Sequence, residues 1–503
     1  MDFDVSTNKI FCFGSSEEKK AVLPVECSII LPDYFPDVMK ILRYTAKTVK
    51  SPVTSEGKNE VVSGNVNIEV NYVSEEGELC SCSQLQPFSH AFECGGNIAA
   101  AEADIAVGEI GCRAVNKRRI DLHGSLDITL RTLCGEEKNL VSSVSGAGCV
   151  FKGEKTETVV PAGEFYKTFT LEEKGELGYG KPPFGKILRS SAFAQVNECH
   201  VIQDKIVTKG EAKIEVLWNP ETDEENAEEG PFLSVFNFPV SRMVEAEGIL
   251  LTDICDARYE ADFPEVSLSE DGTSLNIRLK TGIFARAYRK KSAGYISDMF
   301  SSEYETKTEK TGFSVINEAI PVSLTENIIE KLDLPESAGE VTDIWAEVSS
   351  PKIDSDGEIS FDAKLCMFAR DGEGEHRYFE KAIEKKISAP SKGKRIAFYN
   401  LFAGIKNSEF SVGKDGKAEV SVAVLIDGTA YCAMSTEGIT ACSADTERKI
   451  EKDSAAVILC YAEKGEHIWD IAKRYRAPME SIMEENGIGE EKLDENKMLV
   501  ISC

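Results

Sequence analysis

The residues that could bind a metal or act as nucleophiles are few and scattered. One short segment brings a histidine together with three cysteines, namely Cys80, Cys82, His90 and Cys94. These four side chains are of the types that bind tetrahedral zinc. However, the segment lacks a Cys-x-x-Cys pair, and Cys80 and Cys82 would lie on one face of a strand as ordinary buried thiols. We therefore expect no metal site and no cofactor.

No other group of residues predicts catalysis. The segment 179–186 contains two glycines and two lysines near a repeat boundary, but its Pro182 and Pro183 are incompatible with the helix N-terminus that a phosphate-binding loop requires. Carboxylates are so frequent in this chain that no pair can be singled out as a hydrolase site. The sequence thus favours a protein that is not an enzyme.

The charge of the chain argues against nucleic acid and lipid as partners. Its 503 residues include 86 acidic and 57 basic side chains, which gives a formal net charge of −29. Such a chain repels phosphate groups within the Debye length. The sequence shows neither a signal peptide nor an apolar run long enough to span a membrane, and its 15 cysteines have no paired spacing. We expect a cytoplasmic protein with free, mostly buried thiols.

An internal duplication is visible in the first half of the chain. Lys-Ile-Leu-Arg occurs at 40–43 and again at 186–189, an offset of 146, and the same offset relates Ala46 to Ala192 and Ile68 to Ile214. Several landmarks with one offset indicate a repeat.

Alternating apolar residues surround these landmarks and predict half-buried strands. The runs 65–72 and 211–218 are each followed by a second run, at 120–130 and 274–280, and a weaker third copy has runs at 361–367 and 417–424. Ile68, Ile214 and Leu365 should then occupy equivalent strands. We expect an N-terminal segment over 1–30, antiparallel, sandwich-like β repeats over 31–150, 181–310 and 335–450, and a small domain over 454–503. An acidic stretch over 222–229 is typical of a solvated loop.

The last fifty residues follow a different pattern. An apolar run at 457–463 predicts a strand, and Ile468, Ile471, Ala472 and Tyr475 recur at helical spacing. Pro478 suits the start of a second helix, Asn486-Gly487 suits its end, and residues 498–501 predict a closing strand. The sequence therefore predicts a small βααβ domain.

This segment resembles the LysM domain. The resemblance rests on the run Gly465-Glu466-His467-Ile468-Trp469-Asp470-Ile471-Ala472, followed by Tyr475, Asn486 and Leu499-Val500-Ile501. His467, Asn496 and Ser502 depart from the family, which has threonine, glycine and proline there. The resemblance implies that a partner or an N-acetylated glycan binds the two loops formed by Gly465, Glu466, His467, Ile468, Trp469, Asn486, Gly487 and Ile488. Trp469 is either a contact residue or, as the favoured alternative, a packing residue.

The front of the chain resembles the SPOCS repeat, also described as DUF3794. The residues that carry this resemblance are Leu23-Pro24, Pro36-Asp37-Val38 and Lys40-Ile41-Leu42. Three such repeats before a LysM domain are similar to the SipL-type family of clostridial spore-coat morphogenesis proteins. The resemblance implies an adaptor in the mother-cell cytoplasm, at the forespore surface, with a spore-coat morphogenetic ATPase as its partner. The alternative is a protein that binds peptidoglycan.

Overall fold

The chain folds almost entirely into antiparallel β-strands. The structure, a computed structural model, describes residues 3–178, 182–220, 231–270, 272–333, 338–413, 417–450 and 457–502. The acidic stretch 222–229 lies outside these residues. Strands account for 78% of the chain and helices for 3%, and the two helices are close to the C-terminus. The predicted mainly-β fold class is confirmed.

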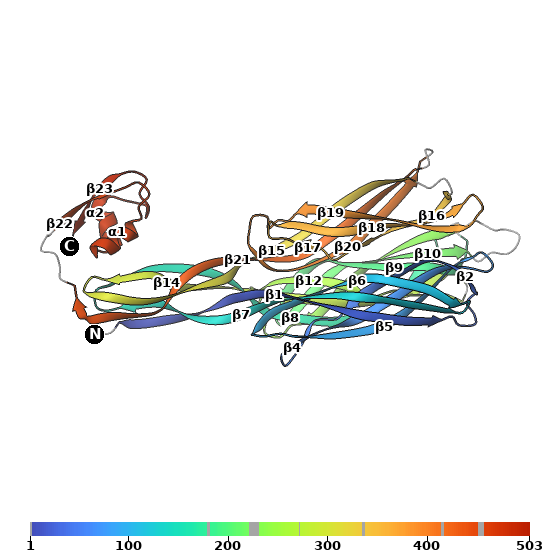
Figure 1. The fold of residues 1–503 in the computed structure, drawn as a ribbon, viewed down its shortest axis with the longest axis horizontal. Helices are drawn as coiled ribbons and strands as arrows, with labels where there is room; N and C mark the ends of the chain where they lie inside the picture. Colours follow the sequence, from blue (N-terminus) through green and yellow to red (C-terminus); the bar gives the residue numbers. More distant parts are fainter. Residues whose placement is uncertain are drawn as a thin grey trace.

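Six very long strands organise the molecule. They are β1 (Asp4–Ile30), β7 (Arg119–Ser145), β8 (Cys149–Glu176), β14 (Ser274–Ser301), β15 (Tyr304–Asp333) and β21 (Lys417–Lys449). They pair antiparallel as β1 with β7, β8 with β14 and β15 with β21. Even the 27 residues of β1 span about 90 Å at ~3.3 Å per residue. Each pair is therefore long enough to take part in two structures. At one end of the molecule it belongs to a β-sandwich, and at the other end to a narrow stalk (Figure 1).

Each pair forms one sheet of a β-sandwich, which we call modules 1, 2 and 3 in chain order. The facing sheets contain β2 (Val38–Lys50), β3 (Thr54–Glu56), β4 (Asn59–Ser74) and β5 (Leu79–Glu93) in module 1; β9 (Phe184–Ile202), β10 (Lys205–Pro220) and β11 (Phe232–Glu245) in module 2; and β16 (Ala338–Val348), β17 (Lys352–Ile353), β18 (Glu358–Asp371) and β19 (His376–Ser388) in module 3. Alongside the long strands lie β6 (Ile98–Asn116), β12 (Ile254–Ala261), β13 (Glu265–Leu268) and β20 (Ile396–Val412).

The repeat landmarks occupy equivalent places in the three modules. Ile68 lies in β4 between β2 and β5, Ile214 in β10 between β9 and β11, and Leu365 in β18 between β16 and β19. All three side chains are buried in the core between the two sheets of their module. Alternation of period two places them there, because every second side chain of a central strand faces the opposite sheet.

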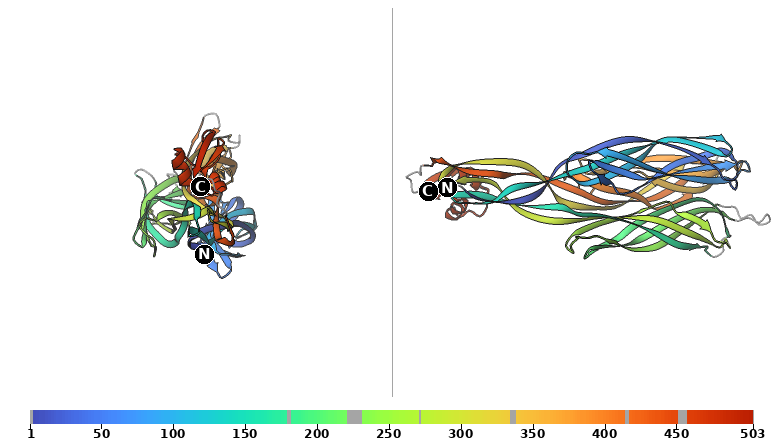
Figure 2. Two further views of the ribbon diagram at one scale, coloured as in Figure 1. Left: turned by 90° about the vertical axis from the view of Figure 1, so that its left-hand side faces the viewer. Right: turned by 90° about the horizontal axis from the view of Figure 1, so that it is seen from below.

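Matching β-bulges mark where each module meets the stalk. The register of the long pairs shifts at Phe13/Ser16, at Ala287/Tyr288 and at Ile316/Glu318. A bulge bends a strand and increases its twist. The bulges therefore let one strand leave the sheet of a sandwich and enter the stalk without a break in its pairing, and the strands cross at this point in the right-hand view of Figure 2.

The stalk consists of three two-stranded ribbons, one from each module, formed by residues 4–13 with 135–145, 149–161 with 288–301, and 304–316 with 433–449. An isolated ribbon of two strands is marginally stable, so the three must share a core. Its buried residues come from all three ribbons: Phe13, Leu133, Val159, Tyr288, Ile316 and Tyr431 where the modules begin, and Ile10, Leu140, Tyr295, Phe313 and Val315 farther out.

The three modules pack around a common axis, which the end-on view of Figure 2 shows as three lobes. At the end away from the stalk, the guanidinium groups of Arg43 and Arg189 lie over the ring of Trp345, each 4.9 Å from its centroid. Arg43 also pairs with Glu347, and Arg189 pairs with Asp343 at 2.8 Å. The arginine at the end of the repeated Lys-Ile-Leu-Arg therefore connects module 1, and likewise module 2, to module 3.

A second buried ion cluster joins modules 1 and 2. The carboxylate of Glu102 on β6 accepts hydrogen bonds from Lys50, from Arg258 on β12 at 3.1 Å and from Arg286 on β14 at 2.6 Å. Burial by itself would raise the pKa of Glu102, but the three cations outweigh it and hold the pKa well below its ordinary value. Glu102 is therefore charged and fully paired although it is only 4% exposed.

Replacing Asp343 by Ala should destabilise the assembly of the three modules. The substitution leaves the buried Arg189 without its counter-charge, which costs about 3–5 kcal/mol of unfolding free energy. The double variant Arg189→Leu/Asp343→Leu should lose less, because it removes both charges. Differential scanning fluorimetry and urea titration of both variants provide the measurement. Glu419→Ala, at the exposed pair with Lys331, is the control and should cost below about 1 kcal/mol. Equal losses for the single and the double variant would contradict the role of this pair.

Candidate docking surface on the C-terminal domain

The C-terminal domain has the order β22 (Val457–Ala462), α1 (Ile468–Tyr475), α2 (Met479–Asn486) and β23 (Lys497–Ser502). The two strands pair antiparallel, and the helices cover one face of this small sheet. Ile468, Ile471 and Ala472 are fully buried, as their helical spacing predicts. α2 ends at Gly487, whose positive φ of 62° favours glycine. The predicted βααβ arrangement is confirmed.

The first predicted binding loop is tied to residues 491–493 by backbone hydrogen bonds. The N–H of Gly465 donates to the carbonyl of Leu493 and the N–H of Ile468 to that of Glu491, both at 2.8 Å, and Leu493 donates back to Glu466 at 3.0 Å. The carboxylate of Glu466 accepts the N–H of Glu463 and a bond from Arg474, and these contacts lower its pKa. Within this loop His467 is exposed, whereas Ile468 belongs to the core.

The second predicted loop also has structural partners. The Asn486 side chain donates to the carbonyls of Ile482 at 2.8 Å and Val500 at 2.7 Å, and its Oδ1 accepts the N–H of Val500 at 2.7 Å. Asn486 therefore fastens α2 to β23. Gly487 is exposed, and Ile488 packs partly against the core of the domain.

Trp469 faces the stalk. Its indole N–H donates to a carboxylate oxygen of Asp298 on β14 at 2.9 Å, and its ring centroid lies 5.5 Å from that of Phe300. Only 5% of Trp469 is exposed. Trp469 is thus a packing residue that joins the C-terminal domain to the stalk of its own chain.

Asp298 is the centre of this contact. Besides Trp469, it accepts bonds from Lys473 on α1 at 2.7 and 2.9 Å and pairs with Lys310 of the neighbouring ribbon at 3.0 Å. Burial would raise the pKa of Asp298, but the hydrogen bonds from Lys473, Trp469 and Lys310 lower it to about 2. Arg476 adds bonds to the carbonyl of Ser301 and to Glu305. The basic face of α1 therefore lies on acidic groups near the stalk tip, where Figure 1 shows the domain.

The opposite face of the domain carries a different surface. The outward positions of β22 and β23 hold five exposed apolar side chains, which we call the apolar sheet face: Val457, Leu459, Tyr461, Met498 and Val500. Leu459 is opposite Val500, and Tyr461 is opposite Met498. Leu459 is 67% exposed and Tyr461 59%. Their combined area, on the order of 500 Å², is in the range in which exposed apolar patches mark interaction sites.

The apolar sheet face was not among the predicted site residues, although the sequence contains a signal for it. A strand with one solvent-exposed face normally alternates apolar and polar residues. Residues 457–462, Val-Ile-Leu-Cys-Tyr-Ala, are apolar at every position, so both faces of β22 are apolar. The two helices of the domain cover only one of these two faces of β22.

The cysteine and histidine group in module 1 lies on β5 and immediately after it. Cys80 and Cys82 are buried, Lys186 donates to the sulfur of Cys80 at 3.0 Å, and His90 packs against Phe92. In the part of the chain that the structure describes, no three His, Cys, Asp or Glu side chains are arranged to bind a metal ion. The described residues also contain no helix of the length and apolarity needed to cross a bilayer.

Comparison with known proteins yields no relative. No protein-family model, no curated protein and no solved structure matches this chain.

The contact between the C-terminal domain and the stalk should weaken in acid. Lys473 and Trp469 help to lower the pKa of the Asp298 carboxyl from its ordinary value of 3.8 to about 2, so its contribution to the contact is fully present above pH ~4 and is lost as the pH falls through about 2. The indole N–H resonance of Trp469 in ¹⁵N-labelled full-length protein should follow this loss. The same resonance should shift at pH 7 in Asp298→Lys, which places a third cation beside Lys473 and Lys310.

The control is Glu309→Gln, an exposed acidic position on the same ribbon as Lys310. Its Trp469 resonance should match that of the unaltered protein at every pH. If Asp298→Lys left this resonance in place, Trp469 would not be held by Asp298.

Proposed function

We propose that this chain is a non-catalytic adaptor in the assembly of the endospore coat or envelope. The observation that carries the proposal is the apolar sheet face on a domain whose opposite side is already anchored to the chain. An apolar surface of this size, close to polar neighbours and away from the modules, is suited to binding another protein. The proposal places the chain in the mother-cell cytoplasm at the forespore surface.

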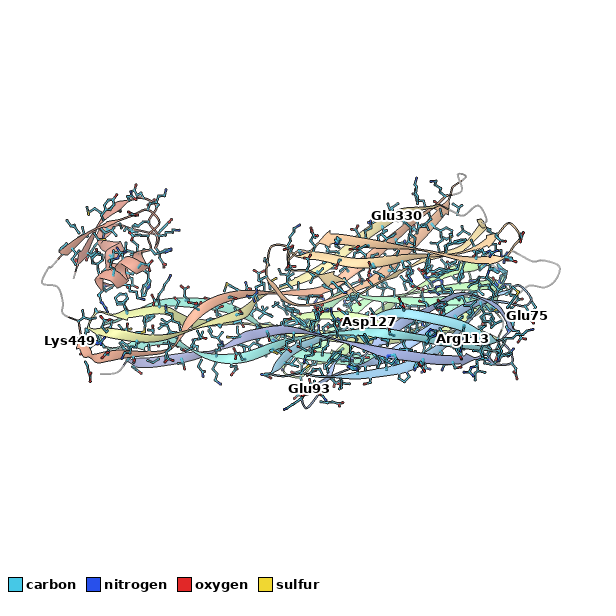
Figure 3. The ribbon with its side chains drawn as sticks, viewed as in Figure 1. Glu75, Glu93, Arg113, Asp127, Glu330 and Lys449 are labelled. Atoms are coloured by element: carbon cyan, nitrogen blue, oxygen red, sulfur yellow. The ribbon has the colours of Figure 1, made fainter. Side chains whose placement is uncertain are left out.

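The shape of the molecule supports a bridging role. Uninterrupted strand pairing connects each module to the stalk, so the molecule is a rod rather than a chain of independent beads. In Figure 3, Lys449 lies near the stalk tip and Glu75 at the far end of module 1. A single strand already spans about 90 Å, so the stalk tip and the far end of module 1 are separated by more than the diameter of a small domain. Such a rod holds a partner at one end away from whatever binds the modules.

The partner is proposed from the LysM-like and SPOCS-like sequence features. In proteins that this chain resembles, these features accompany a spore-coat morphogenetic ATPase as the protein partner. The net charge of −29 favours a protein partner over a phosphate-rich surface. The LysM-like domain would then bind the ATPase through the apolar sheet face.

Peptidoglycan is the alternative ligand, and it would use the two loops instead. Of the loop residues, Ile468 is buried in the core, Trp469 is bound to Asp298 and Asn486 is bound to β23. His467 and Gly487 are exposed and Gly465, Glu466 and Ile488 only partly so, which is a small surface for a glycan chain. The protein-binding interpretation is therefore preferred.

Replacing Leu459 and Tyr461 together by Asn should weaken binding to the purified morphogenetic ATPase by about 30-fold or more. Two central apolar contacts are lost, and buried interface side chains of this kind each cost about 1–2 kcal/mol. Biolayer interferometry with the full-length chain measures the change, and circular dichroism verifies the fold.

The matched control is His467→Glu, which alters a predicted loop but not the apolar sheet face and should bind like the unaltered protein. The proposal would be wrong if both variants bound the ATPase equally well. Sedimentation with purified peptidoglycan tests the alternative: retention that His467→Glu abolishes would favour the glycan.

A further inference from the structure

Two cysteines face each other across module 2. Cys199 is on β9 and Cys255 is on β12, so they belong to the two different sheets of this sandwich. Their sulfur atoms are 2.8 Å apart, although 56 residues separate them in the sequence. Both thiols are partly exposed, and small or aliphatic side chains, among them Ala162, Ala257 and Val201, surround them.

The geometry requires little movement to join the two sulfur atoms. A disulfide bond is about 2.05 Å long, so a shift of less than ~1 Å closes the gap. Neither strand has to change its register.

We propose that Cys199 and Cys255 form a site of reversible oxidation that cross-links the two sheets of module 2. The oxidant is a small-molecule disulfide of the glutathione or cystine type. One cysteine thiolate attacks this disulfide and releases the first small thiolate, which leaves a mixed disulfide on the protein. The other cysteine, after losing its proton, attacks the protein sulfur of the mixed disulfide and releases the second small thiolate. The protein loses two electrons, and the oxidant is reduced to two thiols that take up the two protons.

The two cysteines have different roles in this exchange. The two thiols share one hydrogen bond in which either sulfur can be the donor, and the sulfur that accepts it has the lower pKa. A thiolate is the attacking species in thiol–disulfide exchange. The cysteine whose sulfur accepts this hydrogen bond is therefore the attacking residue, and the other is the resolving residue.

Oxidation should stabilise module 2. A cross-link between residues 56 apart restricts the unfolded chain, and the strands it joins need no rearrangement. The melting temperature of the full-length protein should rise by roughly 5 °C or more. Modules 1 and 3 have no cysteine at the position of Cys255, where β6 has Ala101 and β20 has Tyr399.

The experiment treats the full-length protein with oxidised glutathione, blocks the remaining thiols with iodoacetamide and maps the peptides by mass spectrometry. The expected result is one peptide pair cross-linked through Cys199 and Cys255, and a melting temperature that falls back after dithiothreitol. Cys199→Ser and Cys255→Ser should show neither the cross-link nor the shift. Cys112→Ser, at a partly exposed cysteine of module 1, should show both.

The mapping of the unaltered protein decides the proposal even if a variant folds poorly. Recovery of Cys199 and Cys255 as alkylated thiols after oxidation would overturn it. So would preferential cross-linking of either cysteine to another partner. In Cys199→Ser and in Cys255→Ser, glutathione should remain attached to the cysteine of the pair that is left, and its absence from that cysteine in both variants would overturn the proposal.

Discussion

The structure depends on strand pairing that continues without interruption from each sandwich into the stalk. A two-stranded ribbon has no core of its own, so three ribbons must come together before any of them is stable. That requirement brings the three modules side by side, because each ribbon is the extension of one module's sheet. The matching bulges at Phe13/Ser16, Ala287/Tyr288 and Ile316/Glu318 allow the change of direction while the hydrogen-bonded pairing persists.

The three repeats are similar but not identical, and their differences let them close around one axis. Where modules 1 and 2 have Arg43 and Arg189, the corresponding bulged position of module 3 has Asp343. Three arginines at this place would repel one another in a buried setting. Asp343 instead pairs with Arg189, and the ring of the neighbouring Trp345 lies against both guanidinium groups. The third repeat is therefore complementary in charge to the first two.

The C-terminal domain shows how an intramolecular contact determines which surface remains for a partner. Trp469 and Lys473 of α1 bind Asp298 of the stalk, and Arg476, at the end of this helix, binds Glu305. Because the helices cover one face of the two-stranded sheet, the other face has no cover in the described part of the chain. The exposed Leu459 and Tyr461 of this face are therefore better placed for a protein partner than the loops at Gly465 and Asn486.

Local patterns in the sequence determined the strands, the equivalence of Ile68, Ile214 and Leu365, and the βααβ order of the last fifty residues, because side-chain periodicity depends only on near neighbours. The continuation of each module into a shared stalk was not predictable in this way, since the pairing of β1 with β7 joins residues from 89 (Ile30 with Arg119) to 141 (Asp4 with Ser145) positions apart. The role of Trp469 was equally open. Its partner Asp298 is 171 residues away, and only the folded chain brings the two together. The same holds for Cys199 and Cys255: their spacing predicted no pair, and the packing of two sheets placed their sulfur atoms in contact.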